Sequence, residues 1–181
     1  MNQNMTTVSL SGLYKKAILE NWDLMAFSDY DGGDFKYSDV ASIIQSLHLF
    51  YQVSGIKKGD KIAILGRNSA RWGTTFLSVL TSGAVVVPIL PDFSVTDTNH
   101  ILSHSESKIV FAQKSLLDKI DLKKAGELRT IVLLDDFSVY ESADPDATFK
   151  LTDAFAYYKK NPSQLKELNF HDWEREDCCV I

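Results

Sequence analysis

The sequence has few of the features that mark secreted, disulfide-bonded or membrane-spanning proteins. Only Cys178 and Cys179 are cysteines, and they are adjacent. Neighbouring residues of a strand point to opposite faces, so this pair suits neither an ordinary disulfide nor one metal ion. We expect both to be small apolar strand residues, with a redox role as the alternative. The longest apolar run, residues 84–90, is far too short to cross a bilayer.

Targeting and binding signals are equally scarce. The first ten residues, MNQNMTTVSL, lack the basic start and apolar core of a signal peptide. The 19 Lys and Arg residues stand against 24 Asp and Glu residues, and no basic block stands out. Binding to nucleic acid by counterion release requires such a block, as does binding to an anionic membrane surface. We therefore expect a cytoplasmic protein with no nucleic-acid partner and no transmembrane segment.

What the sequence does contain is enough apolar material for one folded domain over residues 1–181. Hydrophobic residues make up 45% of the chain. Four continuous apolar runs begin at Ile62, Val85, Ile109 and Ile131, at steps of 23, 24 and 22 residues. Continuous rather than alternating runs are typical of strands covered on both faces, and each step has room for one helix. The pattern predicts βαβ units, and hence a three-layer α/β fold with a parallel sheet.

Helix start and stop signals lie between these runs. Ser38 is expected to open a helix that ends at Gly55, and Asn68 to cap one that ends just before Gly83. Ser94 and Ser115 are expected to cap two further helices. At the ends of the chain we expect an N-terminal helix over 13–22, a hairpin over 24–38, a polar loop over 135–150, a helix over 151–160 and a strand at 174–181. The hairpin turn is expected at Asp31-Gly32-Gly33.

Patterns that carry chemistry are mostly missing. Neither GxxxxGK[ST] nor GxGxxG follows a predicted strand. The segment beginning Gly66-Arg67 follows the first predicted strand, which starts at Ile62. It could be a plain helix cap, or it could bind an anion through backbone N–H groups and Arg67. His100 and His104 share a helix face but lack companion zinc ligands. Asp29, Asp31 and Asp34 lack the glycine spacing and closing Glu of a calcium loop. We therefore predict no catalytic, cofactor-binding or metal-binding residue in the chain.

Several segments, taken in order, resemble the AMP-forming acyl-CoA synthetases of the adenylate-forming superfamily. The segment FKYSDV at 35–40 is similar to the family's early Y-x-E-L motif. The segment from GIKKGDKIAILGRNSARW to GAVVVPILP at 55–91 resembles its G-D-x-V-A … N-x-x-x-W … G-A-V-x-V-P stretch. The segment ILSHSESKIVFA at 101–112 resembles one common in long-chain fatty acyl-CoA synthetases. The resemblance implies scaffold roles for Tyr37 in N-terminal packing, Gly83 at a helix-to-strand turn and Pro88 near a strand end.

The resemblance also implies an activity for a longer parent protein. Family members activate a carboxylic acid with ATP and Mg²⁺, release pyrophosphate and pass the acyl group to coenzyme A. In the family, a segment like EREDCCVI leads into the loop that closes over the ATP phosphates. We therefore expect this chain to be an N-terminal subdomain cut before that loop, inactive alone, with the downstream part of its own chain as partner. We also expect the uncovered surface to favour a homodimer, which light scattering across a concentration series would report. Peripheral membrane association of the parent is left open.

Two other readings do not involve catalysis. A free-standing α/β module of receiver type would need an acidic cluster at the strand ends, and only Asp135-Asp136 lies at such a place. An inactive homologue kept as an interaction protein is the second alternative. The acyl chain length, the oligomeric state and any regulation do not follow from the sequence.

Overall fold

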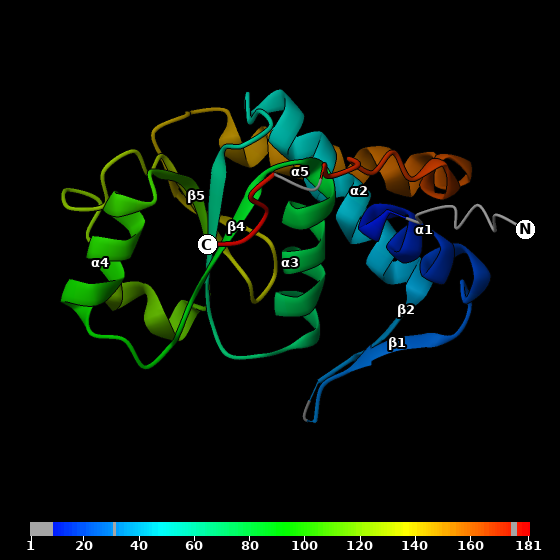
Figure 1. The fold of residues 1–181 in the computed structure, drawn as a ribbon, viewed down its shortest axis with the longest axis horizontal. Coiled ribbons are helices and arrows are strands. Elements are labelled where there is room, and N and C mark those ends of the chain that lie inside the picture. The colour runs from blue at the N-terminus through cyan, green and yellow to red at the C-terminus, as the bar shows by residue number, and fades with distance from the viewer. Residues whose placement is uncertain (1–8, 31, 175–176) are drawn as a thin grey trace, which may run out of the picture.

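The computed structural model describes residues 9–30, 32–174 and 177–181 (Figure 1). Its centre is a five-stranded sheet with the strand order β4-β3-β5-β6-β7. Helices cover both faces, so the expected three-layer α/β fold is confirmed. The strands are β3 (Lys61–Leu65), β4 (Val85–Ile89), β5 (Ser107–Ala112), β6 (Thr130–Leu133) and β7 (Val139–Ser142).

The four predicted parallel strands are present. Both β4 and β5 pair in parallel with β3, and β6 pairs in parallel with β5. The fifth strand, β7, was not expected: it runs antiparallel to β6, in a segment predicted to be a polar loop. Because β7 is an edge strand with two exposed residues, Tyr140 and Glu141, its sequence carries no continuous apolar run.

Side chains of the central strands alternate between two apolar layers. Ile62 and Ile64 of β3 face α2 (Tyr37–Val53), α3 (Ala70–Ser82) and α5 (Ala147–Lys160). Ala63 and Leu65 face α4 (Val95–His104) and η1 (Lys114–Lys119), a 3-10 helix. Figure 1 shows α4 on one side of the sheet and α3 on the other. Burial on both faces explains why β3 reads as one unbroken apolar run.

The N-terminal elements form a separate small layer on α2. The helix expected over 13–22 is α1 (Leu10–Glu20), which begins and ends a few residues earlier, and the expected hairpin pairs β1 (Met25–Ser28) with β2 (Asp34–Lys36). Of the expected turn residues, Asp31 lies outside the described residues. Ile18 of α1 packs with Val40 and Ile44 of α2, together with Leu168, which follows the 3-10 helix η2 (Pro162–Glu167). This third cluster joins the N-terminal helix α1 to the segment that follows η2.

Several predicted helix boundaries were wrong by a few residues. The cap of α3 is Ser69 rather than Asn68, and its Oγ accepts from Trp72 N. The cap of α2 is Lys36 rather than Ser38, because Asp39 accepts from Lys36 N at 2.8 Å and so fixes the earlier start. The helix expected from Ser115 is 3-10 and begins at Lys114, and α5 begins at Ala147 rather than Leu151. The cap at Ser94 is confirmed.

The last residues pair with the free edge of β4. Val180 forms a parallel bridge with Val86. Val86 N donates to Cys179 O at 3.0 Å, and Ile181 N donates to Val86 O at 3.1 Å. The expected strand over 174–181 is therefore represented by one parallel bridge, while Arg175 and Glu176 lie outside the described residues. Among the helices of the described part, none has the length and apolarity needed to span a bilayer.

Candidate functional site

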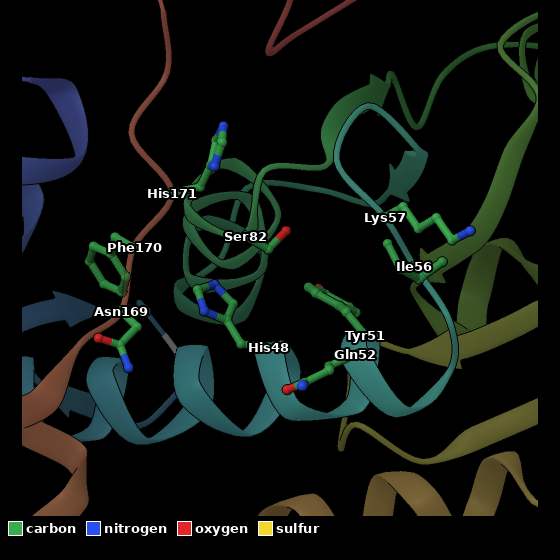
Figure 2. A pocket seen from close by; sticks show the side chains of 9 residues that line it. All are labelled: His48, Tyr51, Gln52, Ile56, Lys57, Ser82, Asn169, Phe170 and His171. Carbon is green, nitrogen blue, oxygen red and sulfur yellow. The ribbon is translucent and has the colours of Figure 1, made fainter.

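Among the hollows of the described structure that are lined by polar side chains, two lie at opposite ends of the sheet. One is a cavity of about 490 Å³ beside the amino ends of β3 and β4. Its walls come from α2, the loop after α2, the last turn of α3 and residues 169–171 (Figure 2). The other is a crevice of about 190 Å³ at the carboxyl ends of β3, β5 and β6.

The cavity is built on a polar break in the apolar stripe of α2. His48 lies one turn after the buried Ile44 and one turn before the buried Tyr51, so its ring faces the protein rather than the solvent. Figure 2 shows the ring of His48 between the ring of Phe170 and the end of α3. The centroids of these two rings lie 5.8 Å apart in an edge-to-face arrangement.

The opposite wall depends on the end of α3. Gly83 ends this helix with φ +89°, a conformation that favours glycine. A Cβ there would lie 3.0 Å from Cγ of His171, so the glycine also lets residues 169–171 approach closely. His171 N donates to Thr81 O at 2.8 Å, and Trp173 Nε1 donates to Leu80 O at 2.7 Å. These bonds fix the C-terminal segment across the end of α3.

Hydrogen bonds assign the tautomer of His48. Its Nε2 lies 2.9 Å from the carbonyl oxygen of Ser78 and 3.1 Å from Thr81 Oγ1. Thr81 Oγ1 donates its own proton to Leu77 O at 2.6 Å, so both neighbours of Nε2 act as acceptors. Nε2 therefore carries the hydrogen atom, and Nδ1 carries the lone pair when the ring is neutral. Nδ1 has no hydrogen-bond partner among the described residues.

Burial keeps the two titratable groups at the floor of the cavity neutral. Desolvation lowers the pKa of His48 to about 4, against the weaker opposing effect of the bond to Ser78 O. Desolvation also raises the pKa of Tyr51, whose hydroxyl bonds to Ser78 Oγ at 2.9 Å. At neutral pH the cavity floor thus offers a neutral imidazole acceptor beside an aromatic ring.

The crevice lies where the order of the strands reverses. The chain leaves β3 for β4 on one side and then crosses to β5 on the other side of β3. In open α/β sheets, ligands bind outside the carboxyl ends of the strands at such a point. Gln113 Oε1 accepts from Arg67 N at 2.8 Å across it, and Asp135 Oδ2 accepts from Lys114 N at 2.8 Å. Polar groups of the crevice are therefore engaged in bonds with its own backbone.

The start of α3 at this edge is already occupied by side-chain acceptors. Ser69 Oγ accepts from Trp72 N at 3.1 Å, and Asp29 of the hairpin accepts from Ala70 N at 2.7 Å. The guanidinium of Arg67 lies 3.6 Å from Asp92, and both groups are exposed. Three N–H donors of this segment, those of Arg67, Ala70 and Trp72, thus already have side-chain acceptors, which favours the helix-cap reading over the anion reading of Gly66-Arg67.

Comparison with known proteins identifies the fold's relatives. The family described as "AMP-binding enzyme" matches residues 16–181, nearly the whole chain. The chain belongs to the AMP-binding enzyme family. The anthranilate CoA ligase AuaEII, solved in complex with anthranoyl-AMP, superposes with a TM-score of 0.75 at 16% identity, covering 99% of this chain and 32% of that one.

Curated relatives of this AMP-binding enzyme chain carry different names. The long-chain-fatty-acid–CoA ligase of Thermus thermophilus is 29% identical over 115 residues, which is 59% of this chain and 21% of the relative. The 4-coumarate–CoA ligase 4 of Arabidopsis thaliana is 32% identical over 101 residues, 55% of this chain and 17% of the relative. Surfactin synthase subunit 2 of Bacillus subtilis is 25% identical over 111 residues, 61% of this chain and 3% of the relative. The chain thus spans about a fifth or less of these proteins.

The scaffold residues carried by the resemblance lie at the expected kinds of position. Tyr37 is the first residue of α2 and packs in the N-terminal cluster, and Gly83 lies at the turn from α3 to β4. Pro88 is the second-last residue of β4, in register with Ile64 of β3. Their importance to the family scaffold stays a prediction.

The other polar candidates serve local structure. The rings of His100 and His104 stack with centroids 5.7 Å apart. Within residues 9–30, 32–174 and 177–181, no three His, Cys, Asp or Glu side chains gather in a way that could hold a metal ion. Asp29 caps α3, and Asp34 accepts from Ser28 Oγ at 2.6 Å. Sequence reasoning missed His48, although one polar residue inside an apolar helical stripe was a usable signal.

Proposed function

We propose that this chain is the N-terminal α/β unit of an AMP-forming acid–CoA ligase of the long-chain fatty acid type. The observation that carries the proposal is the family match over residues 16–181. The segment ILSHSESKIVFA and the Thermus thermophilus relative support the long-chain assignment. In the parent, a fatty carboxylate attacks the α-phosphate of ATP, pyrophosphate leaves, and the acyl group passes to the thiol of coenzyme A.

We propose that ATP and Mg²⁺ are not bound by the residues described here. A phosphoryl-transfer site needs free backbone N–H groups, cationic side chains and carboxylates for the metal. Here two N–H groups at the start of α3, those of Ala70 and Trp72, are used by Asp29 and Ser69, and the described residues gather no metal-binding cluster. We therefore assign ATP, Mg²⁺ and coenzyme A to the rest of the parent, and to the unit described here a scaffold role.

We further propose that the rest of the parent packs against the β4 edge. Apolar side chains are exposed there, with Leu90 61%, Val180 42% and Ile181 55% accessible. Figure 1 shows the C-terminus beside β4. The parallel bridge of Val180 already begins a sixth strand at this edge. For the 181-residue chain alone, in which the rest of the parent does not cover this edge, we propose a homodimer through it; a cytoplasmic location of the parent is also part of the proposal.

Acid-dependent exchange of pyrophosphate into ATP, measured on the natural protein that contains this chain, tests the assignment. We expect exchange with palmitate and at least tenfold slower exchange with 4-coumarate and anthranilate, because a pocket matched to an aliphatic chain binds those acids with poorer complementarity. Exchange with the aromatic acids alone would overturn the long-chain assignment. No exchange with any carboxylic or amino acid would support the inactive interaction module instead.

A further inference from the structure

We propose that the cavity between α2, the end of α3 and residues 169–171 is a second binding site, separate from adenylation. Its ligand is a planar aromatic ring whose edge donates a hydrogen bond to Nδ1 of His48. The volume of about 490 Å³ lies within the range of small-molecule sites. The site lies at the amino ends of the strands, whereas the switch-point crevice lies at their carboxyl ends.

The polar atoms of the cavity define what the ligand must offer. The hydroxyl of Tyr51 is bonded to Ser78 Oγ, and Ser82 Oγ donates to Val79 O at 2.8 Å. Nδ1 of His48 is different, because the hydrogen atom of the ring is committed to Ser78 O on the Nε2 side. This lone pair has no protein partner in the described part of the chain and is not one of its fully buried polar atoms, so a ligand N–H or O–H can take the place of water there.

The walls favour a flat ring over an aliphatic ligand. The rings of His48, Tyr51 and Phe170 border the floor, with His48 lying 6.4 Å from Tyr51 and 5.8 Å from Phe170 between centroids. Aromatic pairs at such separations gain from edge-to-face or offset contacts. Ile56 adds an apolar wall on the far side, as Figure 2 shows.

Charge is not part of the recognition. Lys57 is the one lysine that lines the cavity, and Figure 2 shows its side chain directed away from His48. The ligand is therefore a neutral ring at its point of contact. Both a nucleobase and a phenolic ring have this chemistry, since each combines a flat face with an edge donor.

Nitrogen NMR of the histidine rings tests the proposal on the 181-residue chain labelled at histidine. We expect adenosine or phenol, each at millimolar concentration, to shift Nδ1 of His48 and to leave His104 unchanged. A shift with adenosine alone identifies a nucleobase site, and a shift with phenol alone a phenolic site. Toluene has the same flat ring without a donor and should cause no comparable shift; an equal shift would overturn the hydrogen-bond assignment.

Matched variants separate binding from folding. His48→Gln retains an amide donor toward Ser78 O but removes the ring lone pair, so affinity, measured on the ligand's own NMR signals because the reporting ring is gone, should fall about two- to tenfold. Ile56→Phe fills the cavity without touching His48 and should abolish the shift. His104→Gln, at an exposed position on α4, is the control and should bind as the unchanged chain does. Absence of any His48 shift, or full affinity in both cavity variants, would overturn the proposal.

Discussion

Replacing Phe111 with alanine should lower the free energy of unfolding by about 3–5 kcal/mol, the range for loss of a buried phenylalanine ring. Phe111 is fully buried in β5, with 0% of its surface accessible. Its ring meets those of Tyr51 and Phe137 edge to face, at centroid distances of 6.2 and 6.4 Å. The substitution leaves a void between the sheet and α2. Denaturant unfolding should show a lower midpoint at an unchanged slope.

Phe149→Ala is the matched control for this substitution. Phe149 lies on α5 with 67% of its surface accessible, so its removal should change the free energy of unfolding by less than about 0.5 kcal/mol. Equal effects of the two substitutions would contradict the placement of the core between the sheet and the helices α2, α3 and α5.

Lowering the pH from 6.5 to 4 should destabilise the fold by up to about 3 kcal/mol through His48 alone. Burial lowers the pKa of His48 to about 4 in the folded chain, whereas the unfolded ring keeps an ordinary pKa near 6.5. Between these values the unfolded chain binds more protons, so the contribution of His48 is complete above pH 6.5 and is lost as the pH falls toward 4. Urea unfolding at half-unit pH steps measures this slope.

His48→Gln isolates the contribution of His48 because the glutamine side chain does not titrate. Its unfolding free energy should vary less between pH 6.5 and 4.5 than that of the unchanged chain. The aspartates whose pKa is lowered in the folded state, namely Asp60, Asp136, Asp144 and Asp177, lose their contributions at lower pH and do not obscure the comparison. Identical pH slopes in the two proteins would show that His48 is solvated rather than buried.

The parallel core was predictable because its residues face apolar layers on both sides. Ile62 to Leu65 and Val85 to Ile89 form unbroken apolar runs for that reason. The edge strand β7 was not predictable, because only one of its neighbours is a strand and its exposed residues are polar or aromatic. The predicted positions of the helix caps were wrong by one or two residues. One reason is that adjacent residues, such as Asn68 and Ser69, are both good cap formers.

The cavity could not be predicted because tertiary contacts create it. His48, Ser82 and His171 are far apart in the chain and meet only when residues 169–171 cross the end of α3. His48 at helical spacing from Ile44 and Tyr51 indicated an interior polar contact, but nothing in the sequence indicated its partners. The scaffold positions Gly83 and Pro88 were found through resemblance to a family, and their geometry was then visible in the structure.

Isothermal titration of the 181-residue chain with ATP and Mg²⁺ tests the central claim most directly. The claim is that this unit of an AMP-binding enzyme supplies scaffold and that the nucleotide is bound elsewhere in the parent. The account predicts no Mg²⁺-dependent binding heat at micromolar ATP, because side chains already accept from two N–H groups at the start of α3 and polar groups of the switch-point crevice bond to one another. Weak, Mg²⁺-independent binding of the adenine ring at millimolar concentration would belong to the His48 cavity. Magnesium-dependent ATP binding with a micromolar dissociation constant would contradict it.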